Sequence, residues 1–117
     1  MDIQAIIFDF SKAPAGNERE VLCTLRKRGY KLASSFDSGA CDVIFERKEH
    51  ASRETLLAVA KTLGVAPGEC AVAESESDRL FAAKDSGMTA IGIGEAAACI
   101  YADICLGSFA ELADIFA

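Results

Sequence analysis

The amino-acid sequence predicts an α/β fold in three layers, with a mostly parallel sheet and helices on both of its faces. Short apolar segments alternate along the chain with amphipathic segments of about 10 to 12 residues, which is the pattern of β-α-β units. The first apolar segment, residues 3–8, is apolar at almost every position, as expected for a strand that helices cover on both sides. The length of 117 residues indicates one domain, residues 1–117.

Capping signals and glycines predict where the helices begin and end. In the first half of the chain, Asn17 and Glu20 form a capping-box pattern, and Gly29 provides a stop. Strands are then expected at 30–35 and 42–45.

The second half of the chain repeats this alternation. Helices are expected to begin at Ser52, at Ser75 or Ser77, and at Ser108, where Glu111 completes a second capping box. The first two of these helices are expected to end at Gly64 and Gly87. Strands are expected at 70–73, 89–93 and 103–106.

The connection at residues 36–41 is short for a parallel sheet, because a parallel crossover needs roughly a dozen residues or more. Residues 42–45 either pair antiparallel with 31–35 as a hairpin, or run to a sheet edge without a covering helix. The turn sequence Asp37-Ser38-Gly39 favours the hairpin.

Composition excludes several classes of function. The net charge of −6 argues against nucleic acid as a partner. No run of about 18 apolar residues predicts a membrane span, and the first residues lack the basic stretch of a secretory signal. Five cysteines without a CxxC pair favour reduced thiols and a cytoplasmic location. Three of them lie among apolar residues and are expected to be buried: Cys70, Cys99 and Cys105.

The predicted topology places a candidate site at one edge of the sheet. In open parallel sheets, ligands bind beyond the carboxyl ends of the strands, near the point where the strand order reverses. Four of the predicted loops meet there, and they carry Asp9 and Ser11, Ser34 and Ser35, Lys48 and His50, and Glu74 and Ser75.

Most of the chain resembles the haloacid dehalogenase superfamily, and within it the group of β-phosphoglucomutase-like mutases and phosphatases. The stretch IIFDFS at 6–11 resembles the strand that carries the family's DxD motif. Residues 54–94 resemble its later helices, turn and acidic loop, and ADICLGSFAEL at 102–112 resembles its usual ending. The resemblance implies a Rossmann-like core without the family's helical cap domain.

The resemblance assigns the chemistry first to Asp9. It implies that Asp9 is a nucleophile that forms an aspartyl-phosphate while a metal ion neutralises the phosphate. Ser11 stands where the family has the acid that serves as general acid and base, and losing that proton transfer costs roughly 10²- to 10⁴-fold in rate. The competing interpretation is that Asp9 only caps a turn.

The same resemblance implies a phosphate site on the neighbouring loops. Ser34 matches the family's phosphate-binding hydroxyl, and Ser35 lies next to it. Lys48 is the preferred match for the lysine that offsets phosphate charge, although counting along the chain puts His50 at that position.

The resemblance also implies a weak Mg²⁺ site. Glu74 matches the first of two acids that help to hold the metal, whereas Ser75 replaces the second. Asp9 and Glu74 are two carboxylates of the kind that Mg²⁺ binds. The competing interpretation is that Glu74 is a solvated loop acid.

Two functional hypotheses follow. The first is a degenerate domain with little or no phosphotransfer activity, which acts as a binding, regulatory or structural module. The second is an Mg²⁺-dependent phosphohydrolase, or a phosphoenzyme former, that uses Asp9 on a phosphorylated small molecule. The serines at positions 11 and 75 favour the first hypothesis.

The short connection at 36–41 also predicts an interface. Without a helix there, part of one sheet face lacks cover, and exposed apolar sheet surface usually marks an interface. We expect a homodimer, or a partner protein, at the face near Phe36, Val43 and Phe45.

Overall fold

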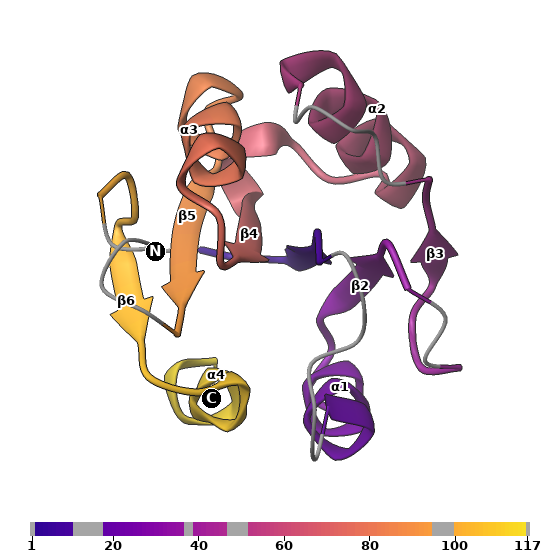
Figure 1. Cartoon of the computed structure of the whole chain (residues 1–117). Helices are drawn as coiled ribbons and strands as arrows, with labels where there is room; N and C mark the ends of the chain where they lie inside the picture. Colours follow the sequence, from indigo (N-terminus) through magenta and orange to yellow (C-terminus); the bar gives the residue numbers. More distant parts are fainter. Residues whose placement is uncertain (1, 11–17, 37–38, 47–51, 95–99, 117) are drawn as a thin grey trace.

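The sheet is parallel throughout and has six strands in the order β3-β2-β1-β4-β5-β6 (Figure 1). The computed structural model describes residues 2–10, 18–36, 39–46, 52–94 and 100–116. The strands are β1 (Ala5–Phe8), β2 (Lys31–Ser34), β3 (Val43–Ile44), β4 (Cys70–Glu74), β5 (Thr89–Ile93) and β6 (Ile104–Leu106). The helices are α1 (Glu18–Lys27), α2 (Arg53–Leu63), α3 (Ser77–Asp85) and α4 (Leu112–Ile115). The predicted three-layer α/β fold is confirmed.

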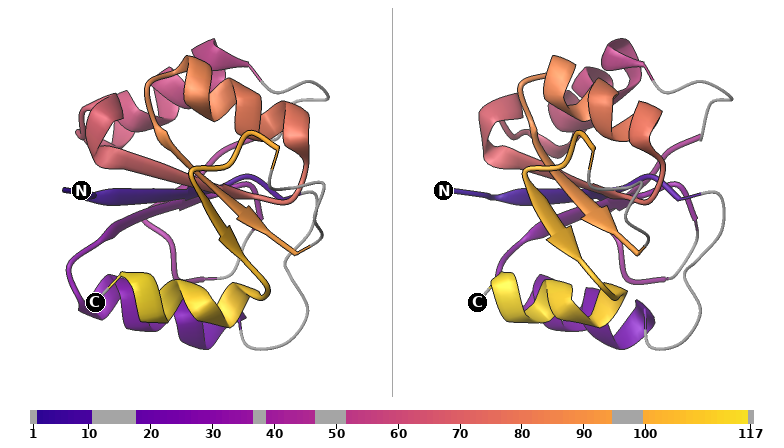
Figure 2. Two further views of the ribbon diagram at one scale, coloured as in Figure 1. Left: turned by 90° about the vertical axis from the view of Figure 1, so that its left-hand side faces the viewer. Right: turned by 60° about the vertical axis from the view of Figure 1, so that its left-hand side comes forward.

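Two helices cover each face of the sheet. Helices α1 and α4 lie side by side on one face, and α2 and α3 lie on the other (Figures 1 and 2). The alternation along β1 shows both faces: Ile6 and Phe8 belong to the core under α1 and α4, whereas Ala5 and Ile7 belong to the core under α2 and α3. All four side chains are fully buried, which explains why the strand is apolar at every position.

The helix ends follow the predicted signals where the structure describes them. Ser52 caps α2 by accepting a hydrogen bond from the Thr55 amide at 3.2 Å, and Gly64 ends this helix in the left-handed region at φ +75°. The capping box of Ser108 and Glu111 is present, although it opens a 3₁₀ turn that leads into α4. The predicted cap at Asn17 lies outside the described residues.

The predicted hairpin at β3 is wrong. Strand β3 pairs parallel with β2, with Ala33 opposite Val43, and it forms the edge of the sheet, as in the alternative interpretation. Strand β3 has only two residues, and they pair with the last two residues of β2. The connection therefore has to run back along β2 for only about two residues before β3 begins. The described part of the connection between β2 and β3, residues 35–36 and 39–42, contains no helix.

An aspartate directly precedes each of the two edge strands, β3 and β6. Next to β3, the Asp42 amide donates to the carbonyl of Leu32 at 2.8 Å, and the Asp42 carboxylate accepts from the Leu32 amide at 2.9 Å. Next to β6, Asp103 makes the same two bonds with Ala90, both at 2.8 Å. Each carboxylate thus extends the ladder by one bond before the strand begins.

Asp103 predicts an acid-sensitive part of the stability. The hydrogen bond from Lys84, at 2.5 Å, lowers the pKa of Asp103, burial opposes this, and the Ala90 amide lowers the pKa further. A lowered pKa contributes stability above the ordinary carboxyl pKa, and this contribution is lost as the pH falls through the lowered value. We expect Asp103→Asn to be less stable than the wild type at about pH 7, with a difference that shrinks towards about pH 3 in urea unfolding. Asp85→Asn, at an exposed position, is the control for the loss of one negative charge. An equal loss of stability in Asp103→Asn at both pH values would show that the lowered pKa of Asp103 is not the cause.

The cysteines differ from one another in their surroundings. Cys70 is buried as predicted, and burial, with a smaller contribution from Glu69, raises the pKa of its thiol to about 11. Cys105 is exposed and disulfide-bonded, so the expectation of a buried, reduced thiol is wrong for this residue. Cys99 lies outside the described residues. None of the helices in the described part of the chain is long and apolar enough to cross a membrane.

Candidate functional site

Two acids predicted for the site lie at the ends of neighbouring strands. Strands β1 and β4 pair in register, with Phe8 opposite Ala73. Asp9 and Glu74 therefore lie next to each other at the carboxyl ends of these two strands. The order of the strands reverses between β1 and β4, which is where open parallel sheets bind ligands. Both acids are buried, with exposed fractions of 5% for Asp9 and 1% for Glu74. The interpretation of Glu74 as a solvated acid is therefore wrong.

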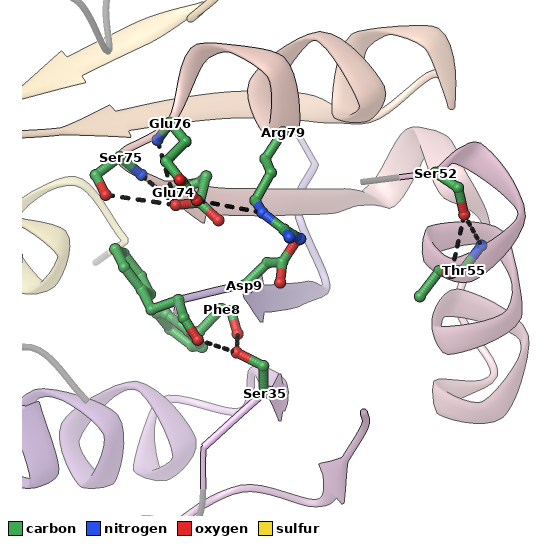
Figure 3. A network of polar contacts seen from close by, with 10 residues as sticks. Phe8, Asp9, Ser35, Ser52, Thr55, Glu74, Ser75, Glu76 and Arg79 are labelled. Carbon is green, nitrogen blue, oxygen red and sulfur yellow. Dashed lines mark hydrogen bonds and ion pairs between the residues drawn. The ribbon is translucent and has the colours of Figure 1, made fainter. Parts of the chain in front are cut away.

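A buried arginine, Arg79, occupies the space next to Asp9 (Figure 3). Its side chain extends from α3 and is 3% exposed, and its Nη1 lies 2.8 Å from Oδ2 of Asp9. Its Nε lies 3.2 Å from Oε2 of Glu76, one turn earlier. The guanidinium therefore joins the end of β1 to the start of α3.

Arg79 is not among the site residues that the sequence predicts, although the helix pattern contains a signal for it. Arg79, Ala82 and Ala83 have the i, i+3, i+4 spacing that puts residues on one helix face. The two alanines are buried, so Arg79 lies on the face that points to the core. A charged residue there needs a partner inside the protein.

The electrostatics of the site keep Arg79 charged. Burial alone lowers the pKa of the guanidinium, but the hydrogen bond to Asp9 and the negative charge of Asp9 raise it by more. Glu74 and Glu76 add to the increase, so the pKa of Arg79 lies above its ordinary value. Changes of pH therefore do not neutralise this cation in the folded protein.

Glu74 stabilises the loop that opens α3. Its Oε1 accepts hydrogen bonds from the amides of Ser75 at 2.7 Å and Glu76 at 3.3 Å, and the Ser75 hydroxyl lies 3.4 Å away. One carboxylate oxygen is thus turned to the backbone of its own loop (Figure 3).

The two serines after β2 lie nearby but bond to backbone carbonyls. Ser35 donates from its amide to Phe8 O at 2.9 Å and from its hydroxyl to Phe10 O at 2.5 Å, which joins the loop after β2 to the loop after β1. Ser34 is fully buried, and its hydroxyl donates to the carbonyl of Phe36. Their predicted role in binding phosphate stays a prediction, as do the roles of Ser11, Lys48 and His50, which lie outside the described residues.

In this arrangement, one oxygen of each described acid already faces other donors, so Asp9 and Glu74 do not offer Mg²⁺ both of their oxygens. Mg²⁺ needs a near-octahedral shell of oxygens, whereas Oδ2 of Asp9 faces Arg79 and Oε1 of Glu74 faces backbone amides. In the described ranges, no group of three or more His, Cys, Asp or Glu could hold a metal ion.

Comparisons with known proteins identify the fold. No protein-family model matches the chain, and no curated protein matches it. The structure resembles a β-phosphoglucomutase from Clostridium difficile, with 21% identity over 80% of this chain and 49% of that one, at a TM-score of 0.66. A haloacid dehalogenase (HAD) phosphatase from Thermococcus onnurineus has 25% identity over 82% of this chain and 54% of that one, at a TM-score of 0.70.

A third solved structure matches nearly the whole chain. The cobalt-bound deoxy-D-mannose-octulosonate 8-phosphate phosphatase from Haemophilus influenzae has 17% identity over 98% of this chain and 87% of that one, at a TM-score of 0.78. Against the first two proteins, this chain spans about half of their length. Its longest connections between neighbouring elements, such as 9–17 and 94–103, are too short to hold a cap domain. The fold is therefore that of a HAD-like core without an inserted cap.

Proposed function

We propose that this chain is a degenerate HAD-like domain with little or no phosphotransfer activity, which acts as a binding, regulatory or structural module. The observation that supports this most is the state of Asp9. The predicted nucleophile is 5% exposed, and one of its oxygens is 2.8 Å from a buried guanidinium.

The ion pair opposes the attack of Asp9 on phosphorus. A carboxylate attacks phosphorus through an oxygen lone pair, and the Arg79 hydrogen bond reduces the nucleophilicity of the Asp9 oxygen that accepts it. The local charge also disfavours a phosphate ester. The described side chains there carry three negative charges, on Asp9, Glu74 and Glu76, against the one positive charge of Arg79. Among the described side chains, the net charge that faces a phosphate is therefore negative.

The residue at position 11 supports the same conclusion. A serine does not transfer protons as a general acid and base at neutral pH, and losing such a group costs roughly 10²- to 10⁴-fold in rate. This loss adds to the effect of the ion pair, because it concerns a different step.

The second candidate is an Mg²⁺-dependent phosphohydrolase, or phosphoenzyme former, with Asp9 as the nucleophile and a phosphorylated small molecule as the substrate. It is favoured by the place of Asp9 at the end of β1, beside the end of β4. It requires the Asp9–Arg79 pair to open before the reaction.

Turnover distinguishes the two candidates. We would assay the wild type and Asp9→Asn with p-nitrophenyl phosphate and a panel of phosphate monoesters in Mg²⁺, and search for an aspartyl-phosphate by intact mass after incubation with acetyl phosphate. The proposal predicts equal background in both proteins and no added phosphoryl mass. Turnover or phosphorylation that disappears in Asp9→Asn would establish the second candidate.

A protein partner at the β3 edge stays part of the proposal. Phe36 is buried, at 9% exposed, whereas Val43 and Phe45 are half-buried and line a groove of about 420 Å³ with Ile44, which is 55% exposed. We predict self-association through this edge, measured by light scattering at increasing protein concentration. Ile44→Lys is expected to reduce it, with the exposed Ile100→Lys as control. A wild type that stays monomeric would contradict self-association.

A further inference from the structure

We propose that Arg79 is the built-in cation of the site, which neutralises Asp9 and thereby excludes a divalent metal ion. The inference deepens the proposed function, because it concerns the same site, and it rests on that function's account of Asp9. It adds to the serines at positions 11 and 75 a residue on α3 that the site motifs do not include.

The contacts show that Arg79 belongs to the site. It lies 70 positions after Asp9 in the sequence and still makes a direct hydrogen bond with it at 2.8 Å. Both side chains are almost fully buried, at 3% and 7% exposed. The contact with Glu76 at 3.2 Å fixes the guanidinium from the other side. A surface ion pair between mobile side chains would have neither this burial nor this double attachment.

The charges show why the site needs a cation. Asp9 and Glu74 are both buried, and a buried carboxylate is strongly unfavourable unless a counter-charge or hydrogen bonds compensate it. Backbone amides compensate one oxygen of Glu74. For Asp9, Arg79 supplies a full positive charge.

The same contact competes with a metal ion. A Mg²⁺ ligand oxygen lies about 2.0–2.1 Å from the ion, and Oδ2 of Asp9 already faces Nη1 of Arg79. Two cations at one oxygen repel each other strongly inside a protein. A Mg²⁺ ion that binds this oxygen therefore requires Arg79 to leave, which would take the guanidinium out of a buried position.

Removal of Arg79 is expected to convert the ion pair into a metal site. In Arg79→Ala, Asp9 and Glu74 stay buried while the guanidinium and its side-chain volume are gone. The variant should be less stable than the wild type without metal, and Mg²⁺ should restore part of the loss, because a ligand that binds only the folded state stabilises it.

The experiment measures thermal unfolding with and without MgCl₂ on the order of 10 mM, with NaCl added to match ionic strength. The proteins are the wild type, Arg79→Ala, Arg79→Met, the double variant Asp9→Asn/Arg79→Ala, and Arg53→Ala, which removes an exposed arginine from α2. We expect Mg²⁺ to raise the Tm of both Arg79 single variants by about 4 °C or more. The wild type, Arg53→Ala and the double variant should not respond.

Other outcomes overturn the inference. If Mg²⁺ raises the Tm of the wild type as much as that of Arg79→Ala, then Arg79 does not exclude the metal ion. Folded Arg79 variants that do not respond to Mg²⁺ would show that the acids form no latent metal site. The proposed function fails separately, because Asp9-dependent turnover or phosphorylation contradicts it, whereas none of these Tm values does.

Discussion

Replacing Arg79 by methionine is expected to lower the free energy of unfolding by about 3–5 kcal/mol, because it removes the guanidinium that pairs with the buried Asp9 carboxylate. Asp9 is 5% exposed, so water does not replace the lost partner. Domains of this size have total stabilities of about 5–15 kcal/mol, so the effect is a large fraction of the whole. Urea unfolding at neutral pH measures it.

A double-mutant cycle isolates the pair. Because Asp9→Asn removes the carboxylate that pairs with Arg79, Asp9→Asn/Arg79→Met should lose much less stability than the sum of the two single variants. Arg53→Met, on the exposed side of α2, should stay within about 0.5 kcal/mol of the wild type. Additive losses in the cycle would mean that the two side chains do not interact in solution.

Replacing Phe8 by alanine is the second large effect, with an expected loss of about 3–5 kcal/mol. Phe8 is fully buried under α1 and α4, and its ring centroid lies 5.5 Å from that of Phe109. The substitution leaves a cavity between β1 and the turn that leads into α4, and the tightly packed core cannot fill it completely.

Phe81 provides the matched control for Phe8→Ala. It is 51% exposed on α3, and its ring centroid lies 5.2 Å from that of Tyr101. The same truncation there should cost only about 0.5–1.5 kcal/mol, in the range of an aromatic pair. Equal losses at both positions would show that the packing of Phe8 against the C-terminal elements is not what stabilises the fold.

The fold was predictable because its signals are local. Apolar runs, caps such as Ser52 and stops such as Gly64 depend on a few neighbouring residues, and the structure contains both. The pairing of β3 was not predictable from the length of its connection, because the rule for crossovers assumes strands of ordinary length. A two-residue strand shortens the return path, and its pairing partner lies ten positions away.

The site was predictable only in its backbone placement. The topology puts Asp9 and Glu74 at one edge, because parallel strands end together. The contact that Asp9 makes depends on Arg79 of α3. This helix carries none of the expected motif positions. The helical spacing of Arg79 with Ala82 and Ala83 indicates its burial, but only the three-dimensional structure shows that its partner is Asp9.

The most direct test of whether Asp9 can accept a phosphoryl group is a titration of the wild type with Mg²⁺ and beryllium trifluoride, monitored by the amide NMR shifts. Beryllofluoride mimics an aspartyl-phosphate, so it binds only where the carboxylate and its surroundings can accept a phosphoryl group. Because Arg79 holds Asp9, we predict no saturable shifts at residues 9–10, 34–35 and 74–75 at millimolar Mg²⁺. Saturable shifts there that disappear in Asp9→Asn would contradict the account and show that the phosphoacceptor site still assembles.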